Sequence, residues 1–148
     1  LSDYLSDSFW KPMGAKIPAP WQIDSKENNM VKAFCCIASS ARDFARLGKL
    51  YKQNGEWNGV QLLDSTFIAN SITPKFSNAP FYAYGWWLAN YKNKEIFYNR
   101  GHLGQLSIVI PEDDLIIVRL GNLISKENGE AHSKDFYTYI DEAYKIIQ

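Results

Sequence analysis

The sequence predicts an α+β fold in which helices come first, an antiparallel sheet follows and one helix ends the chain. Two observations support this prediction. In the first half, apolar residues recur at helical spacing, whereas from residue 84 onward short β-rich runs alternate with turn residues. Residues 133–147 then return to helical spacing with one apolar stripe. The chain has no internal repeat, so we expect a single layered unit.

The first helix is expected over residues 2–10, where apolar side chains recur at helical spacing behind Ser2 as a cap. Pro12 ends this run, because proline cannot continue a helix. Residues 15–30 contain two prolines and little periodicity. They indicate a surface loop, which Trp21 pins to the rest of the chain.

A second helix is expected to follow Ser40. Ser40 and Asp43 have the spacing of a capping box, with a hydroxyl at the N-cap and a carboxylate three residues later. The helix that they open has one apolar face and stops near Gly55, where glycine favours a helix end. A third, shorter helix begins at Asp64 or Ser65, since either side chain can cap it.

Four β-rich runs are predicted to form an antiparallel meander, because turn residues separate them. Residues 111–114 make a short hairpin connection, and the runs on either side of it are apolar on both faces. Strands of this kind are typically central and covered by helices, and the helix over residues 133–147 is the candidate cover. The four runs are residues 84–88, 95–98, 105–110 and 115–120.

Composition excludes several classes of function. The chain has 16 basic and 16 acidic residues, so it lacks the basic surface of a nucleic-acid-binding protein. No apolar run approaches the roughly 18 residues that a membrane span needs. The first residues show neither an initiator methionine nor the layout of a signal peptide. We therefore expect the chain to be cut from a longer protein, which leaves its compartment undetermined.

The two cysteines, Cys35 and Cys36, are adjacent. Neighbouring Cα atoms lie about 3.8 Å apart, below the roughly 4.4–6.8 Å usual for a disulfide. We therefore expect two reduced thiols on a short buried segment, residues 34–38, a state that slightly favours a reducing compartment. His102 and His132 are far apart in the sequence and no C-x-x-C is present, so no metal or other cofactor is predicted.

Two short motifs match patterns of serine acyl-transferases. Residues 8–11 fit S-x-x-K, in which a lysine lies one helical turn from the nucleophile. Here Lys11 directly precedes Pro12, and residues before proline avoid helical backbone, so we prefer a chance match. Residues 91–93 fit Y-x-N but lie in a polar turn between two predicted strands, which favours an ordinary hairpin.

The segment over residues 100–105 is the most informative in the chain. Glycine weakens strand interiors unless a ligand or another backbone comes close, yet Gly101 and Gly104 lie beside a predicted strand. Between them His102 can donate, accept or titrate near neutrality. On the residues alone, a functional site and a glycine-rich start of a strand with a surface histidine are equally supported.

This segment and four other motifs in the same order resemble the serine β-lactamase-related family. That family includes class C β-lactamases, penicillin-binding D-alanyl-D-alanine peptidases, β-lactamase-fold carboxylesterases and 6-aminohexanoate-dimer hydrolases. The tryptophan pair at residues 86–87 and the arginine of the last strand, Arg119, look most like the last branch. The likeness extends over essentially all 148 residues. The five motifs are residues 10–14, 40–46, 84–87, 101–105 and 117–121.

The resemblance implies the C-terminal part of a β-lactamase- or transpeptidase-like fold. Residues 1–82 would belong to a helical subdomain with its connecting loops, and residues 83–148 would form an antiparallel sheet segment with a covering helix. Such enzymes attack with the serine of S-x-x-K, assisted by that lysine and the tyrosine of Y-x-N. The resemblance places all three before residue 1, so the partner of this chain would be the missing N-terminal part of the same protein.

The third motif of the family, K-T-G or H-x-G, would be His102-Leu103-Gly104 in this chain. The resemblance implies that Gly104 lets a substrate backbone lie against the strand edge. His102 would face the cleft and hydrogen-bond a substrate carboxylate or carbonyl, and the N–H of Gln105 would be an oxyanion donor. Replacing a permanent cation and a hydroxyl with His102 and Leu103 weakens carboxylate recognition. That change favours a small-molecule ester or short-amide substrate over efficient β-lactam hydrolysis.

Several alternatives stay open. Trp86 or Trp87 would wall the cleft, but alternation lets only one of them face it, and packing in the core is an equal alternative. The chain could also be a non-catalytic module that binds peptides or cell-wall fragments, or an inactive structural fragment. An intact sheet in this family uses strands from both ends of the chain. The isolated piece should therefore expose a sheet edge, through which homo-oligomers could form.

Overall fold

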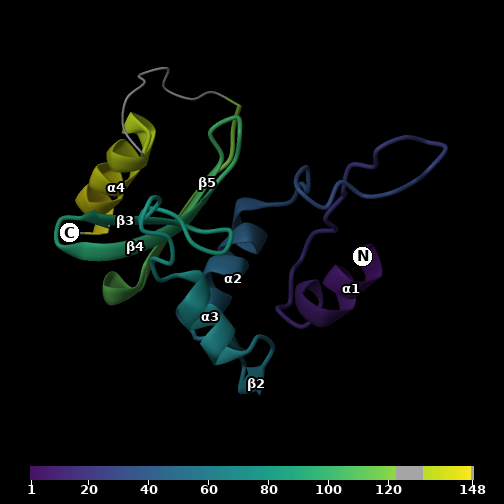
Figure 1. The fold of residues 1–148 in the computed structure, drawn as a ribbon, viewed down its shortest axis with the longest axis horizontal. Helices are drawn as coiled ribbons and strands as arrows, with labels where there is room; N and C mark the ends of the chain where they lie inside the picture. Colours follow the sequence, from purple (N-terminus) through teal and green to yellow (C-terminus); the bar gives the residue numbers. More distant parts are fainter. Residues whose placement is uncertain (123–131, 148) are drawn as a thin grey trace.

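The computed structural model describes residues 1–122 and 132–147 and has an α+β architecture (Figure 1). A four-stranded antiparallel sheet separates two layers of helices. The C-terminal helix α4 (Lys134–Ile147) covers one face, and helix α2 (Ala41–Lys52) lies against the other. The N-terminal helix and the long loop after it lie on the far side of α2 from the sheet (Figure 1). The predicted α+β fold is therefore confirmed.

The first helical segment has the extent that its periodicity predicts. Helix α1 (Ser2–Leu5) continues directly into a π-helical turn, η1 (Ser6–Trp10). No side chain caps its start, so the proposed cap at Ser2 is wrong. The indole N–H of Trp10 donates to the Ile17 carbonyl at 3.0 Å, and its ring packs edge-on against Phe44 of α2. These contacts attach the N-terminal segment to α2.

Helix α2 begins as its capping pattern predicts. The Ser40 hydroxyl accepts from the Asp43 N–H at 3.1 Å. The Asp43 carboxylate is fully buried and accepts from the amides of Lys16 and Ile17 at 2.9 and 3.1 Å, and from Arg46 at 2.8 Å. Burial acts to raise the pKa of Asp43, but the hydrogen bonds to its carboxylate outweigh burial and hold the pKa below its ordinary value. Asp43 thus ties the N-terminal loop to α2.

Two smaller elements follow α2. A two-stranded hairpin pairs β1 (Glu56–Trp57) with β2 (Val60–Gln61), and both turn residues, Asn58 and Gly59, have positive φ. Helix α3 (Ser65–Ser71) follows, and the Asp64 carboxylate accepts from the Phe67 N–H at 2.8 Å. The structure therefore selects Asp64, rather than Ser65, as the cap.

The main sheet is a meander in sequence order, and every neighbouring pair is antiparallel. Its strands are β3 (Trp87–Tyr91), β4 (Lys94–Arg100), β5 (Leu106–Ile110) and β6 (Leu115–Arg119). Every residue of β5 is buried, which confirms a central strand covered on both faces. The first predicted run begins too early, because Gly85 has a φ of +86° and the chain is still turning there. Among the described residues β6 pairs with β5 alone.

Each face of the sheet has its own apolar cluster. On the α4 face, Tyr98, Ile108 and Ile110 pack against Phe136 and Ile140. On the α2 face the cluster has fewer members, which are Ala83, Trp86, Leu88, Phe97 and Val109. A Cβ at Gly48 of α2 would lie 2.8 Å from Cγ2 of Val109, so glycine lets α2 approach β5 closely.

Charged and phenolic groups fix the far end of α4 to the sheet. Tyr91 donates to the Asp141 carboxylate at 3.1 Å, and Lys92 pairs with it at 2.9 Å. Lys92 and Asn93 both have positive φ, at 55° and 59°. The Y-x-N match is thus a tight turn between β3 and β4, as the hairpin interpretation predicts.

Within residues 1–122 and 132–147, no helix has the length and apolar character needed to cross a membrane.

Candidate functional site

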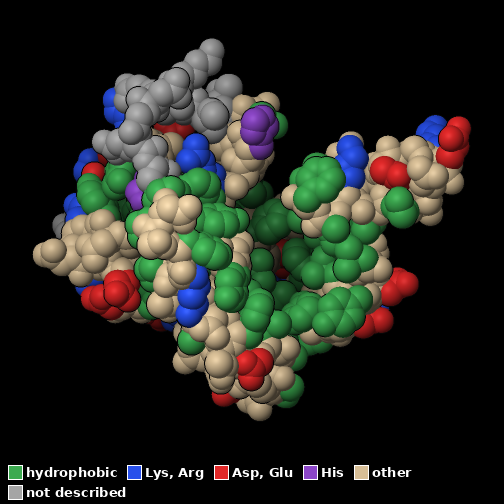
Figure 2. Space-filling view, in the orientation of Figure 1, with side chains coloured by type: hydrophobic (Ala, Val, Ile, Leu, Met, Phe, Trp, Pro, Cys, Tyr) green, Lys and Arg blue, Asp and Glu red, His purple; other side chains and the backbone are tan. Residues whose placement is uncertain are grey.

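A cavity of about 970 Å³ lies on the α2 face of the sheet, next to the connection between β4 and β5. Figure 2 shows a hollow in this part of the molecule, with mostly hydrophobic side chains on its walls. Three parts of the chain line the cavity: the β4–β5 end of the sheet, the N-terminal half of α2 and the loop at residues 33–39. The cavity is therefore at the junction between the helical part of the chain and the sheet.

The floor of the cavity is a row of three residues that are partners across the sheet. Asn99 of β4 pairs with Ser107 of β5, and Ser107 pairs with Val118 of β6. All three line the cavity. Side chains alternate along a strand, so Ser107 shares the α2 face with Val109, which packs toward α2. On the opposite side, Phe44 and Leu47 of α2 form an apolar wall.

Residues 101–105 form the connection between β4 and β5, so Gly104 lies in a turn and not on the edge of a strand. The Gly101 N–H donates to the Gln105 carbonyl at 2.8 Å, and the Gly104 N–H donates to the Gly101 carbonyl at 3.1 Å. Gly104 has a φ of +86°, which reverses the chain there. Both strands that it joins lie inside the meander, and β5 is already paired on both edges. A substrate backbone cannot add to β5 as an extra strand.

The two glycines of the motif serve this connection. A Cβ at Gly101 would collide with Oε1 of Gln105 and lie 3.0 Å from its Cβ. The Gln105 side chain folds back over Gly101, where its Oε1 accepts from the Leu103 N–H at 3.2 Å. Close approach at Gly101 and a left-handed backbone at Gly104 therefore explain both glycines without a ligand. The glycines therefore give no support to a ligand site here, and the expectation of one rests on His102.

Three of the five predicted site residues line the same cavity: His102, Leu103 and Gln105. His102 is exposed and Leu103 is 50% exposed. No acceptor for the Gln105 N–H is found among the residues that the structure describes. Gly104 is buried outside the lining, and its carbonyl accepts from Arg119 Nη1 at 2.6 Å.

The tryptophan pair lies away from the cavity. Trp86 is 3% exposed and packs against Tyr51 and Phe97, with ring centroids 4.6 and 5.0 Å away. Trp87 points to the α4 face, where the Arg100 guanidinium lies 5.4 Å from its ring centroid. Neither residue lines the cavity, so the structure places both in packing positions.

Comparison with solved structures identifies a similar arrangement. The chain superposes on the "Putative 6-aminohexanoate-dimer hydrolase from Bacillus anthracis" with a TM-score of 0.73 and 23% sequence identity. The match covers 97% of this chain and 36% of that chain. The chain has a partial β-lactamase-like hydrolase fold. No protein-family model matches the sequence, and no curated protein matches it. At this identity the likeness shows the fold alone.

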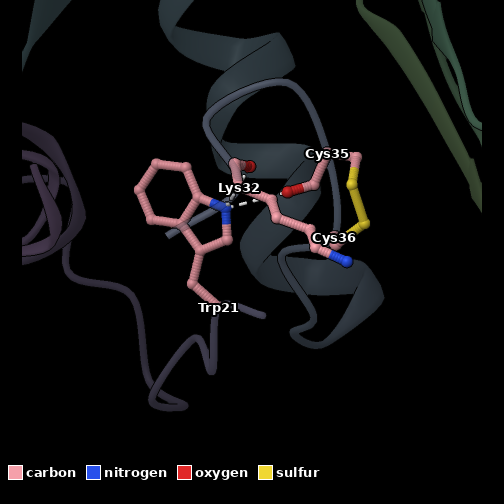
Figure 3. The surroundings of a disulfide bond; sticks show 4 residues. All are labelled: Trp21, Lys32, Cys35 and Cys36. Carbon is pink, nitrogen blue, oxygen red and sulfur yellow. Dashed lines mark hydrogen bonds between the residues drawn. A yellow bond between two sulfur atoms is a disulfide. The ribbon is translucent and has the colours of Figure 1, made fainter. Parts of the chain in front are cut away.

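The loop at residues 33–39, which lines the cavity, contains the largest departure from the sequence expectations. Cys35 and Cys36 form a disulfide, so the prediction of two reduced thiols is wrong (Figure 3). The loop is not buried either, because Phe34 is 85% exposed. The Cα-distance argument fails here because it applies to cysteines on separate stretches of chain, whereas adjacent cysteines close a small ring across one peptide bond.

The backbone around the disulfide is held in a tight turn. The Cys35 N–H donates to the Lys32 carbonyl at 3.0 Å, and Cys36 has a φ of +74°. The indole N–H of Trp21 reaches both carbonyls of this turn, Lys32 at 3.0 Å and Cys35 at 2.8 Å (Figure 3). Trp21 thus ties the predicted loop of residues 15–30 to the disulfide turn, in agreement with its expected pinning role, and the turn is part of the cavity wall.

The S-x-x-K match at residues 8–11 lies outside the cavity lining. Lys11 has helical backbone angles, so the expectation that Pro12 would prevent them is wrong. The Lys11 ammonium nevertheless pairs with Asp7 at 2.6 Å, and both side chains are well exposed. This pairing uses the Lys11 side chain for an ordinary surface ion pair.

Sequence reasoning missed Ser107, Asn99 and the disulfide loop as parts of the cavity. Ser107 had a visible signal, because it is a polar residue inside the apolar run of residues 106–110. The loop had no such signal, since its place opposite the sheet depends on tertiary contacts. Among the described residues, no group of three or more His, Cys, Asp or Glu side chains could hold a metal ion.

Proposed function

We propose that this chain is the C-terminal portion of a serine hydrolase that cleaves ester or amide bonds through an acyl-enzyme. It supplies the H-x-G segment His102–Gly104 on the substrate side, and the serine, lysine and tyrosine come from the rest of the protein. The observation that supports the proposal most is the position of the cavity. It lies between α2 and the sheet, and His102, Leu103 and Gln105 share its lining.

The Gln105 N–H is the proposed oxyanion donor. Gln105 lines the cavity, and among the described residues its N–H donates to no other group. An acyl-transfer site needs such a donor, because negative charge develops on the carbonyl oxygen in the transition state. The turn at Gly104 also fixes the position of the Gln105 amide. A donor that is already in position stabilises the transition state without having to reorganise during the reaction.

His102 and Leu103 indicate the kind of substrate. A histidine offers a hydrogen bond to a carbonyl without a permanent positive charge, and Leu103 adds exposed apolar surface beside it. Phe44 and Leu47 continue this apolar surface on the α2 side. We therefore propose neutral esters or short amides with an apolar part.

The nucleophile is proposed to lie outside the chain because the cavity shows no activated one. Ser39 and Ser107 are the serines in its lining. The Ser39 hydroxyl donates to the Asp43 carboxylate at 3.4 Å, and Ser107 has no hydrogen-bond partner among the described residues. Within that part of the chain, neither hydroxyl has a hydrogen bond to a lysine, histidine or tyrosine that could take its proton.

The test compares the chain with the complete protein, using p-nitrophenyl acetate and the β-lactam nitrocefin as substrates. The chain alone should hydrolyse neither, and the complete protein should hydrolyse the ester much faster than nitrocefin. Replacing His102 with alanine in the complete protein should raise KM or lower kcat for the ester. Turnover by the chain alone that Ser8→Ala abolishes would overturn the proposed division of the active site.

A second candidate function is binding without catalysis. One observation favours it: the described residues form a lined cavity but assemble no activated nucleophile in it. A module of this fold would hold a peptide or cell-wall fragment against His102 and Leu103. A complete protein that binds such ligands but hydrolyses no ester or amide would support this alternative over the enzyme.

A further inference from the structure

The loop at residues 33–39 forms one wall of the cavity, and every residue of it belongs to the lining. Other parts of the lining come from α2 and from the β4–β5 end of the sheet, which contact each other. Neither apolar cluster of the sheet includes a residue of this loop. The position of this wall therefore depends on contacts that the loop makes locally.

Those local contacts meet at the turn that contains the disulfide. The Cys35 N–H donates to the Lys32 carbonyl, and the Gln22 N–H donates to the Cys36 carbonyl, both at 3.0 Å. The Trp21 indole donates to the carbonyls of Lys32 and Cys35 (Figure 3). Cys36 has a φ of +74°, a conformation that residues other than glycine rarely adopt. The disulfide and these hydrogen bonds together hold the chain in the turn.

The stability of the fold does not explain this disulfide. A disulfide stabilises a protein mainly by closing a loop of the unfolded chain, and the effect grows with loop length. Cys35 and Cys36 have a sequence separation of 1, so almost no loop is closed. Cys36 is exposed and Cys35 is half-buried, and exposed disulfides are typically the labile, regulatory kind. The chemistry of the pair is therefore the better explanation.

We propose that Cys35 and Cys36 form a reversible modification site, at which a dithiol reductant opens the disulfide and thereby loosens the cavity wall at residues 33–39. The oxidised pair keeps this wall fixed. In the reduced chain Cys36 returns to negative φ, and the turn that Trp21 now holds gives way. The site goes beyond the proposed hydrolysis, because the two cysteines act on the wall and take no part in acyl transfer.

The exchange takes two steps. One thiolate of the reductant attacks the sulfur of Cys36, the more exposed residue of the two, and Cys35 leaves as a thiolate. The second thiol of the reductant then attacks the reductant's own sulfur in the mixed disulfide, which releases Cys36 and closes the reductant into a cyclic disulfide. The two protons of the dithiol end on Cys35 and Cys36. The chain is thus reduced by two electrons, and the dithiol is oxidised by two.

The adjacency of the two cysteines predicts which reductant works. After the first step, Cys35 lies next to the mixed disulfide on Cys36 and can attack it, which expels the reductant and restores the original disulfide. A dithiol competes with this reversal through its second thiol, whereas a monothiol does not. Dithiothreitol should therefore reduce the folded chain at a thiol concentration at which glutathione leaves most of the disulfide intact. The mass of the chain after alkylation by iodoacetamide measures the reduced fraction.

Hydrogen exchange followed by mass spectrometry tests whether reduction loosens the wall. The amides of Lys32, Cys35 and Ala38 donate to backbone carbonyls in and beside the turn. After reduction by dithiothreitol they should exchange about tenfold faster or more, whereas exchange in β5 should not change. Cys35→Ser with Cys36→Ser is the matched control, and it should exchange as fast as the reduced chain with and without dithiothreitol. Oxidised glutathione should restore slow exchange in the reduced original chain.

The two histidines show whether the change reaches the cavity. His102 lines the cavity on the α2 face, whereas the His132 ring packs against Phe136 on the α4 face, with ring centroids 5.4 Å apart. Reduction should therefore shift or broaden the ring proton signals of His102 in NMR spectra and leave those of His132 unchanged. His102→Gln assigns the two sets of signals by removing one of them.

Three results would overturn the proposal. The first is resistance of the folded chain to dithiothreitol. The second is reduction without faster exchange at residues 32–38, which would show that Trp21 holds the turn without the disulfide. The third is an unchanged His102 signal or an equal change at both histidines, which would reject an effect confined to the cavity wall. None of these results depends on ester hydrolysis, so the proposed hydrolase is tested separately.

Discussion

The two faces of the sheet differ in how completely they are filled. On the α4 face, Tyr98 and Phe136 stack at 4.5 Å between ring centroids, and every residue of the cluster around them is buried. On the α2 face, packing is tight at Val109 but gives way to a cavity at Ser107, two residues earlier in the same strand. The α4 face is therefore filled by side chains, whereas the α2 face keeps a cavity at this end of the sheet.

The largest expected effect on stability comes from shortening a side chain in the filled cluster on the α4 face. Phe136→Ala should destabilise the chain by about 3–5 kcal/mol, because it opens a hole in a packed aromatic cluster. Phe44→Ala, on the cavity side, should cost only about 1–2 kcal/mol, since this half-buried ring borders space that already exists. Urea unfolding followed by circular dichroism measures both, and equal losses would remove the distinction between the two faces.

The next effect concerns the joint between the N-terminal loop and α2. Asp43→Ala should destabilise the chain by about 3 kcal/mol, because Arg46 and the amides of Lys16 and Ile17 lose a buried acceptor. The exposed Asp3 provides a control, and Asp3→Asn should change stability little.

The Asp43 carboxylate also predicts how the stability of the chain changes at acid pH. The pKa of Asp43 lies below its ordinary value in the folded chain, so its stabilising contribution is complete above the unfolded pKa of about 3.9. That contribution is lost as the pH falls through the lower, folded pKa. In Asp43→Asn, the part of the acid loss that this group causes should disappear from urea unfolding measured at a series of pH values.

The order of the elements could be predicted because periodicity records which side chains are buried. The run at residues 108–110 is apolar on both faces, and β5 is indeed covered on both. The Ser40 cap is equally local, because it depends on one hydroxyl and an amide three residues later. The boundaries of the elements were harder to predict from the sequence. The β-rich residues before β3 do not reveal that Gly85 has a positive φ.

The site was predictable only in part, because a cavity is a tertiary feature. His102, Leu103 and Gln105 line one cavity, as neighbours in the sequence can, and their functional roles stay predictions. Ser107 required the register that sets it beside Asn99 and Val118. The two glycines suggested a ligand, but backbone geometry within the β4–β5 connection explains them. A sequence pattern cannot show whether a glycine is needed for close approach of a ligand or for the geometry of its own backbone.

A smaller effect is expected at the end of α4, where the filled face is tied down by charge. Tyr144 donates to the Asp113 carboxylate, and Lys94 pairs with the same carboxylate at 2.7 Å. Tyr144→Phe should cost about 1 kcal/mol through loss of one hydrogen bond to a charged group. Tyr4→Phe is a suitable control, because Tyr4 is exposed.

Alkaline titration checks the same contact. Burial, followed by the hydrogen bond to Asp113, raises the pKa of Tyr144 to about 12, and burial raises the pKa of Tyr98 to about 12. Raised pKa values mean that this stability is complete below the unfolded value of about 10 and is lost as pH rises through about 12. Phenolate absorbance should show late-titrating tyrosines that include Tyr98 and Tyr144, and Tyr144→Phe should remove one of them.

The smallest expected effect on stability concerns the loop wall of the cavity. The disulfide between Cys35 and Cys36 closes a very short loop, so Cys35→Ser with Cys36→Ser should change stability by about 0.5 kcal/mol or less. Iodoacetamide should add to no cysteine of the untreated chain and to both after reduction by a phosphine. Alkylation of the untreated chain would instead show the two reduced thiols that the sequence predicts.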